Sequence, residues 1–186
     1  GEAVVWPATD VDAARKVLCC DSDPAFIAEA LTLPGEATLA EQMKVVDPEA
    51  LHQARNGLSK ALALGMENDL RRLYEHLASV GTYQFDTVAV ARRRLRNVCL
   101  AYLNELDVPD YRALAVQQFA SADNMTDQFA ALSVLANAPG EAGDRALDAF
   151  YTRWQHEALV VDKWLAVQAA SRRGDTRERV ERLTQH

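Results

Sequence analysis

Apolar residues recur along most of this chain at the three- and four-residue spacing of one helix face. The segment Leu147–Trp154 carries large apolar or aromatic residues at i, i+3, i+4 and i+7, so that stripe needs a covering neighbour. The segment Thr87–Leu106 keeps a similar period over its whole length. Strict alternation of apolar and polar residues, which would indicate strands, is confined to the scrap Val4–Trp6. The pattern therefore predicts an all-α fold.

Signals for helix starts divide this pattern into short segments. Asp23-Pro24 and Asp47-Pro48 each place a capping side chain before a proline at the first helical position. Thr38–Glu41 has the pattern of a capping box, and Gly65 suggests a break between two helices. About ten helices follow from these signals, approximately over residues 10–18, 24–33, 38 onward, 48–64, 67–78, 87–106, 109–120, 125–137, around 147–154, 159–170 and 176 onward.

The short turns between these segments are typical of antiparallel helix neighbours, which either close into a bundle or stack into a solenoid. No fixed sequence period is present, so ankyrin and tetratricopeptide arrays are not supported. We predict an irregular stack of antiparallel helix pairs, an ARM/HEAT-like α-solenoid. We expect residues 10–186 to form a single helical-repeat domain after a loose N-terminal segment, residues 1–9.

Composition narrows the function classes. The chain has 186 residues and a net charge of −7, from 20 basic and 27 acidic residues. This acidic balance argues against nucleic acid or an anionic membrane as the main partner. No apolar stretch is long enough for a bilayer span, and Gly1–Pro7 has neither a basic start nor a long apolar block, so we expect neither a membrane span nor a secretory leader within these residues. Cys19, Cys20 and Cys99 have no metal-ligand spacing, which favours reduced thiols and a cytoplasmic location.

Two short motifs look catalytic at first. His156-Glu157 could begin a zincin motif, but Val160 stands where the second histidine must be, and the other histidines are scattered. Gly65–Asn68 resembles the second half of GAMEN, the substrate-amine motif of gluzincin aminopeptidases. Leu64 precedes this motif where GAMEN has alanine, and apolar residues at helical spacing follow it directly. We interpret His156-Glu157 as a polar helix end, and Glu67 and Asn68 as residues that start a helix.

Other polar clusters also have structural interpretations. Arg92–Arg96 contains four arginines that fan round a helix, which predicts a solvated face with one or two bridges to a neighbouring helix. Asn124–Asp127 has the composition of a helix start. Asp162–Trp164 reads as one core aromatic residue beside two exposed charges, and Cys99 as a buried, inert thiol. These residues alone predict a helical domain without an active site.

The same residues carry a resemblance to a known family. Four segments, in order, resemble the C-terminal helical domain of bacterial-type aminopeptidase N, a zinc gluzincin aminopeptidase. They are Asp23–Pro34, Ala91–Leu100, Ala122–Leu132 and Leu159–Ala169. The resemblance implies a bowl of stacked helix pairs that closes over the catalytic cavity of an enzyme removing N-terminal amino acids from peptides. It also implies a parent in which helices continue beyond both ends of these residues.

In that family, zinc and the catalytic residues belong to a preceding domain. HExxH and a full GAMEN are absent from this chain, so we assign it no catalytic, cofactor-binding or metal residues, and expect it to be inactive alone. Its expected partners are the catalytic domain of the same polypeptide and peptide substrates in the shared cavity, with neither nucleic acid nor membrane. The alternative is a stand-alone helical-repeat module for protein interaction.

Overall fold

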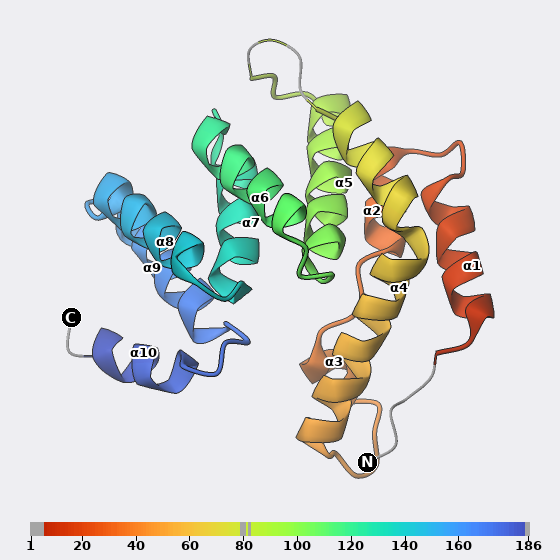
Figure 1. Cartoon of the computed structure of the whole chain (residues 1–186), viewed down its shortest axis with the longest axis horizontal. Helices are drawn as coiled ribbons and strands as arrows, with labels where there is room; N and C mark the ends of the chain where they lie inside the picture. Colours follow the sequence, from red (N-terminus) through yellow and green to blue (C-terminus); the bar gives the residue numbers. More distant parts are fainter. Residues whose placement is uncertain (1–5, 79–80, 82, 185–186) are drawn as a thin grey trace. The chain divides into compact units, whose positions relative to one another are not determined.

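The computed structural model describes residues 6–78, 81 and 83–184, and these residues form ten helices and no strand (Figure 1). The helices are α1 (Ala8–Leu18), α2 (Pro24–Ala30), α3 (Glu36–Ala40), α4 (Pro48–His76), α5 (Thr87–Asn104), α6 (Pro109–Ser121), α7 (Met125–Asn137), α8 (Glu141–Trp154), α9 (Ala158–Ala169) and α10 (Thr176–Leu183). The all-α prediction is confirmed. The strand-like segment Val4–Trp6 lies mostly outside the described residues. The same holds for most of the predicted loose segment 1–9, and its residues Ala8 and Thr9 belong to α1.

Side-chain caps fix several helix starts where the sequence predicts them. Asp23 accepts a hydrogen bond from the Ala25 amide at 2.7 Å, and Asp47 accepts one from the Ala50 amide at 3.1 Å. In both helices proline occupies the first turn, where no amide hydrogen is needed. The prediction of a capping box that starts a helix at Thr38 is wrong, because α3 already begins at Glu36. The Glu36 carboxylate lies 2.8 Å from Nδ1 of His52, and this contact joins the start of α3 to α4.

The predicted break at Gly65 is also wrong, since α4 runs without interruption from Pro48 to His76. The glycine serves a close approach between helices. A Cβ atom at position 65 would lie 2.0 Å from Cγ1 of Val11 on α1, and Arg15 of α1 donates a hydrogen bond to the Gly65 carbonyl. Glu67 and Asn68 therefore lie inside a helix rather than at its start.

The chain divides into two compact units, Gly1–Leu106 and Asp107–His186. In the first unit α4 packs against α1, α3 and α5, and α2 packs against α5. The core of this unit is built from fully buried side chains of the two longest helices. They include Met66, Leu70, Leu95, Cys99, Leu100 and Leu103.

In the second unit each helix packs against the next one along the chain. In addition α6 contacts α8, and α7 contacts α9, so equivalent helices of the pairs α6–α7 and α8–α9 lie together. This arrangement is that of stacked helix pairs. The core contains Leu132, Leu135 and Phe150, and the Phe150 ring lies 6.1 Å from that of Phe129. The prediction of an irregular stack of helix pairs is confirmed.

None of the helices in the described part of the chain is both long and apolar enough to cross a lipid bilayer.

Candidate functional site

The arginine cluster of α5 makes contacts within the first unit rather than forming a free basic surface. Arg93 is 6% exposed, donates to the Gln84 carbonyl at 2.8 Å, and lies 4.7 Å from the centre of the Tyr83 ring. Arg96 lies 4.4 Å from the centre of the Tyr74 ring on α4. Arg92 donates to the His76 carbonyl at 2.9 Å, and Arg94 pairs with Glu29 of α2.

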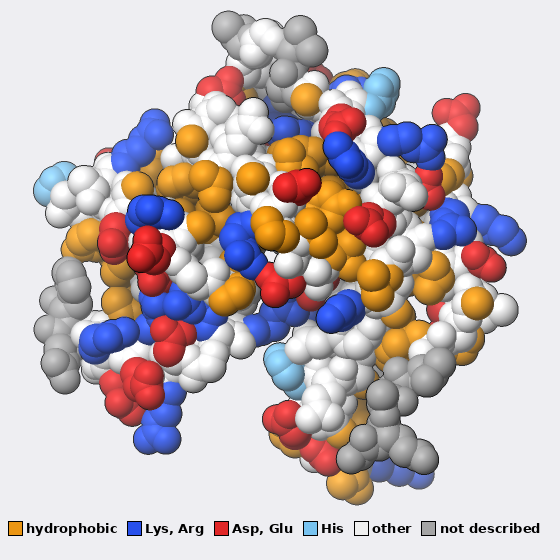
Figure 2. Space-filling view, viewed as in Figure 1, with side chains coloured by type: hydrophobic (Ala, Val, Ile, Leu, Met, Phe, Trp, Pro, Cys, Tyr) orange, Lys and Arg blue, Asp and Glu red, His pale blue; other side chains and the backbone are white. Residues whose placement is uncertain are grey.

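The sequence predicted one or two bridging arginines on a solvated face, but all four connect α5 to another segment. The burial of Arg93 was missed because helical spacing alone does not show that the segment before α5 folds back over it. Figure 2 shows blue and red side chains interspersed on one face of the molecule. The cluster therefore connects α5 to neighbouring segments of the first unit.

Asn124–Asp127 caps α7, as predicted. Oδ1 of Asn124 accepts a hydrogen bond from the Asp127 amide at 2.9 Å, and Nδ2 of Asn124 donates to the Asp127 carboxylate at 3.0 Å. Gln118 of α6, which is 3% exposed, donates to the Asp127 carbonyl at 3.0 Å. The motif thus joins the start of α7 to α6 through the Asp127 carbonyl, while the Asp127 carboxylate accepts its hydrogen bond from Asn124.

Asp162–Trp164 also has the predicted arrangement. Trp164 of α9 is buried, and its indole N–H donates to the Leu147 carbonyl of α8 at 2.9 Å. Asp162 and Lys163 are exposed on the same helix. The tryptophan therefore positions α9 against α8, and Nζ of Lys163 lies 5.6 Å from the centre of the Phe129 ring on α7.

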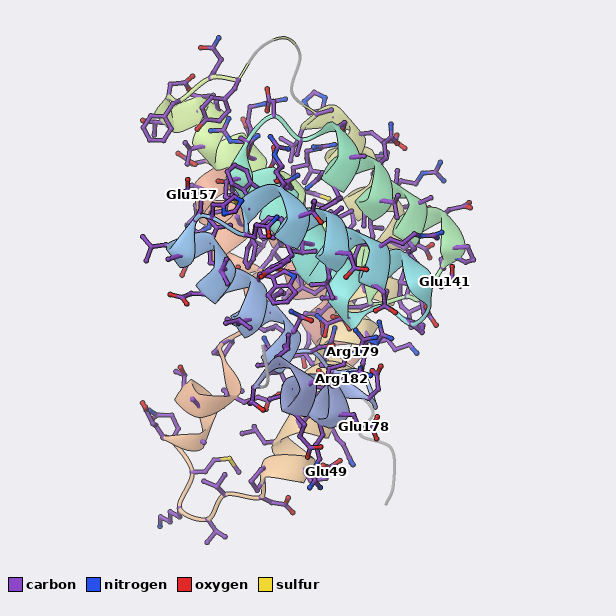
Figure 3. The ribbon with its side chains drawn as sticks, turned by 90° about the vertical axis from the view of Figure 1, so that its left-hand side faces the viewer. Glu49, Glu141, Glu157, Glu178, Arg179 and Arg182 are labelled. Carbon is purple, nitrogen blue, oxygen red and sulfur yellow. The ribbon has the colours of Figure 1, made fainter. Side chains whose placement is uncertain are left out.

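The two motifs with a catalytic appearance lie in separate places. Glu157 is the residue that precedes α9, at the turn after α8 (Figure 3), which confirms the interpretation of His156-Glu157 as a helix end. Met66 of the Gly65–Asn68 motif is completely buried in α4. Within residues 6–78, 81 and 83–184, no three His, Cys, Asp or Glu side chains form a group that could hold a metal ion.

An ion-pair network between α8 and α10 was missed by the sequence analysis. Arg179 lies 2.7 Å from both Asp144 of α8 and Asp175, which precedes α10. Arg173 lies 3.0 Å from the same two carboxylates. The hydrogen bond from Arg179, assisted by that from Arg173, holds the pKa of Asp175 below its usual value. The basic and acidic residues around Asp175 were visible in the sequence, but their partner on α8 was not.

The first unit contains a cavity of about 440 Å³ that the sequence analysis did not anticipate. It lies among α1, α2, α4 and α5, and its lining includes Cys19 and Cys20, Asp69, Arg72, His76 and Arg92. Cys99 is a contrasting thiol, since it is completely buried and desolvation raises its pKa to about 12. The cavity therefore brings two thiols and several charged side chains together.

Stacked helix pairs, joined by contacts of buried arginine, glutamine and tryptophan side chains, define a helical-repeat domain of the armadillo type. The family model described as a domain of unknown function (DUF3458_C) with ARM repeats matches residues 2–186. The chain belongs to this family.

The chain is similar to three curated proteins named aminopeptidase N. It is 38% identical to that of Caulobacter vibrioides over 94% of this chain, 35% to that of Escherichia coli over 100%, and 36% to that of Haemophilus influenzae over 84%. The expected relationship to aminopeptidase N is thus confirmed. The chain spans about a fifth of the length of these relatives (20%, 21% and 18%).

A solved structure shows the same fold. The crystal structure of Legionella pneumophila aminopeptidase A in complex with aspartic acid matches the whole chain with a TM-score of 0.85 and 28% sequence identity. The match covers 23% of that protein. The similarity therefore concerns one region of a much longer polypeptide.

Proposed function

We propose that this chain is the non-catalytic C-terminal helical domain of a zinc-dependent aminopeptidase N. In this proposal it shapes and closes the cavity in which the parent enzyme removes N-terminal amino acids from peptides. The observation that carries the proposal is the family match over residues 2–186, together with similarity to aminopeptidases of about five times its length. The catalytic domain of the same polypeptide is then its partner, and zinc is bound there. The cytoplasmic location stays a prediction.

The contacts of the resembling segments support an architectural role. In three of these segments a residue holds one helix against another segment: Arg93 donates to the Gln84 carbonyl, the Asp127 carbonyl accepts from Gln118, and Trp164 donates to the Leu147 carbonyl. None of them is directed at a group of potential catalytic side chains. A wall built from stacked helix pairs has a defined shape, so it can restrict which peptides enter a cavity without taking part in the bond cleavage.

The first test separates this chain from the chemistry. The purified chain is dialysed against zinc, measured for bound metal, and assayed with aminoacyl amides, with Escherichia coli aminopeptidase N as the active control. We expect neither stoichiometric zinc nor hydrolysis. Turnover by the chain itself, or one tightly bound zinc per chain, would show that the assignment of chemistry to a separate domain is wrong.

The second test concerns the cavity. This chain replaces the homologous region of Escherichia coli aminopeptidase N, to which it is 35% identical. We expect the chimaera to hydrolyse short peptides and to retain the parent's preference for them over long ones. A chimaera that carries Trp164→Ala, which removes the α8–α9 contact, should lose this length preference while it still cleaves a single-residue amide. If the folded Trp164→Ala chimaera keeps the preference unchanged, these helices do not form the selective wall.

A further inference from the structure

The cavity of the first unit has both the size and the chemistry of a ligand site. Its volume is about 440 Å³, which lies in the range of small-molecule pockets. Ile27 of α2 and Leu95 of α5 belong to its apolar part. The polar part combines two arginines, one carboxylate, one histidine and two thiols.

The charges of this cavity differ in sign from those of the chain. Arg72 and Arg92 contribute two positive charges and Asp69 one negative charge, whereas the whole chain has a net charge of −7. Arg92 is held in place by its hydrogen bond to the His76 carbonyl, at 2.9 Å. Asp69 pairs with both Arg15 and Arg72. The Arg72 side chain is 77% exposed, so it can also reach a bound anion. A ligand with two carboxylates matches the two arginines of this cavity.

The two thiols lie at the end of α1, beside these charges. Cys19 and Cys20 are both exposed and neither is in a disulfide. The Cys20 thiol donates to the Val17 carbonyl at 3.0 Å. Positive side chains in the lining of the same cavity attract an anionic disulfide towards this pair, whose thiolate is the nucleophile in disulfide exchange.

We propose that the cavity is a binding and modification site for glutathione, which attaches to the Cys19–Cys20 pair as a mixed disulfide. The co-reactant is glutathione disulfide. A thiolate of the pair attacks one sulfur of this disulfide, so that a protein–glutathione S–S bond forms and the original S–S bond breaks. The departing glutathione thiolate takes up the proton that the protein thiol released. The protein thiol is oxidised and one half of the co-reactant is reduced. Arg72 and Arg92 bind the carboxylates.

The test measures the rate and the place of modification. The 186-residue chain is incubated with glutathione disulfide or with cystamine, a cationic disulfide, and the adducts are located by peptide mass mapping. We expect one glutathione per chain, on the Cys19–Cys20 pair, and a faster reaction with glutathione disulfide than with cystamine. Cys99 should remain unmodified because it is buried. The Cys19→Ser/Cys20→Ser double variant should form no adduct.

A matched pair of variants separates a built site from general surface charge. Arg72→Gln should slow the reaction with glutathione disulfide by about three- to tenfold and leave cystamine unaffected or faster, because it removes a positive charge near the thiols. Arg71→Gln makes the same charge change one residue away, outside the cavity lining, and should change neither rate. Equal effects of the two variants, or equal rates for the two disulfides, would overturn the proposal.

Binding is tested separately from the reaction. S-methylglutathione, which cannot form a disulfide, should protect Cys19 and Cys20 from alkylation by iodoacetamide in the wild-type chain, and protect them less in Arg72→Gln. Absence of protection in both proteins would show that the adduct reflects exposed thiols alone and would refute the binding site.

Discussion

At the scale of single residues, small and polar side chains determine how closely the helices approach. Gly143 of α8 is buried, and a Cβ atom there would lie 2.3 Å from the Leu135 carbonyl oxygen of α7. Tyr102 of α5 donates to the Leu31 carbonyl at 2.6 Å, and burial is the largest cause that raises its pKa to about 12. These contacts involve backbone atoms, which cannot move away as easily as the end of a flexible side chain.

We therefore expect Gly143→Ala to destabilise the second unit by about 1–3 kcal/mol, since the clash outweighs the higher helix propensity of alanine. The measurement is urea unfolding followed by circular dichroism. Gly174→Ala is the control, because it has no atom within 4 Å of the added Cβ and should change the stability little. Equal stabilities of the two variants would contradict this packing argument.

Buried acids should make the first unit sensitive to high pH. Burial raises the pKa of Cys99 from 9.0 to about 12, so the unfolded chain loses this proton first. The stability contributed by the neutral thiol is complete below pH 9 and is lost as the pH rises towards 12, by up to about 1.4 kcal/mol per pH unit. In Cys99→Ala, the free energy of unfolding should fall less steeply between pH 9 and 10 than in the wild type. The variant should also be less stable by a constant amount, which is already present at pH 7. Parallel pH curves for wild type and variant would contradict it.

At the scale of elements, neighbouring helices decide where a helix ends and how it is held. α4 continues through Gly65 because Val11 and Arg15 of α1 pack over that turn. α10 is short and none of its side chains is buried, so the Asp144–Arg179 and Asp175–Arg179 pairs are major contacts of this helix with its surroundings. Figure 3 shows Arg179 on α10 together with Glu178 and Arg182.

The attachment of α10 should depend on the charge of Asp175. Asp175→Asn removes this charge, so we expect faster amide hydrogen exchange across α10 at pH 7 and unchanged exchange in α7. Acidification should act in the same direction. The lowered pKa of Asp175 means that its contribution is present above the unfolded-state value and is lost as the pH falls through the folded-state value.

Glu181→Gln is the matched control for this prediction. It removes a negative charge from α10 whose partner, Arg177, is on the same helix and is exposed. It should leave exchange in α10 nearly unchanged, as expected for a surface pair. If both variants accelerate exchange equally, the net charge of α10 and not the Asp175 network holds the helix.

At the scale of the whole molecule, each unit has its own packed helices. The second unit, Asp107–His186, contains Leu132, Leu135 and Phe150 in its core and two pairs of stacked helices. It is large enough for a core of its own, although domains of this size have small stability margins. The single domain expected over residues 10–186 stays a prediction that a truncation can address.

We expect residues 107–186, expressed alone, to be helical and to unfold cooperatively in urea. Leu132→Ala in this fragment should lower the midpoint, because it removes a fully buried side chain and costs about 2–5 kcal/mol. A fragment with helical circular dichroism but no cooperative transition would indicate that it needs residues 1–106 for its core, in agreement with a single domain.

The sequence by itself determined the helical class, the capped starts at Asp23, Asp47 and Asn124, and the resemblance to aminopeptidase N. These features depend on residues close together in the chain, so local spacing and capping chemistry are sufficient to predict them. Only the tertiary structure showed that α4 is continuous, that Arg93 is buried, and that Cys19 and Cys20 share a cavity with Arg72 and Arg92. Each of these depends on which distant segment packs against the residue, and the desolvation and contacts that follow are absent until the helices assemble.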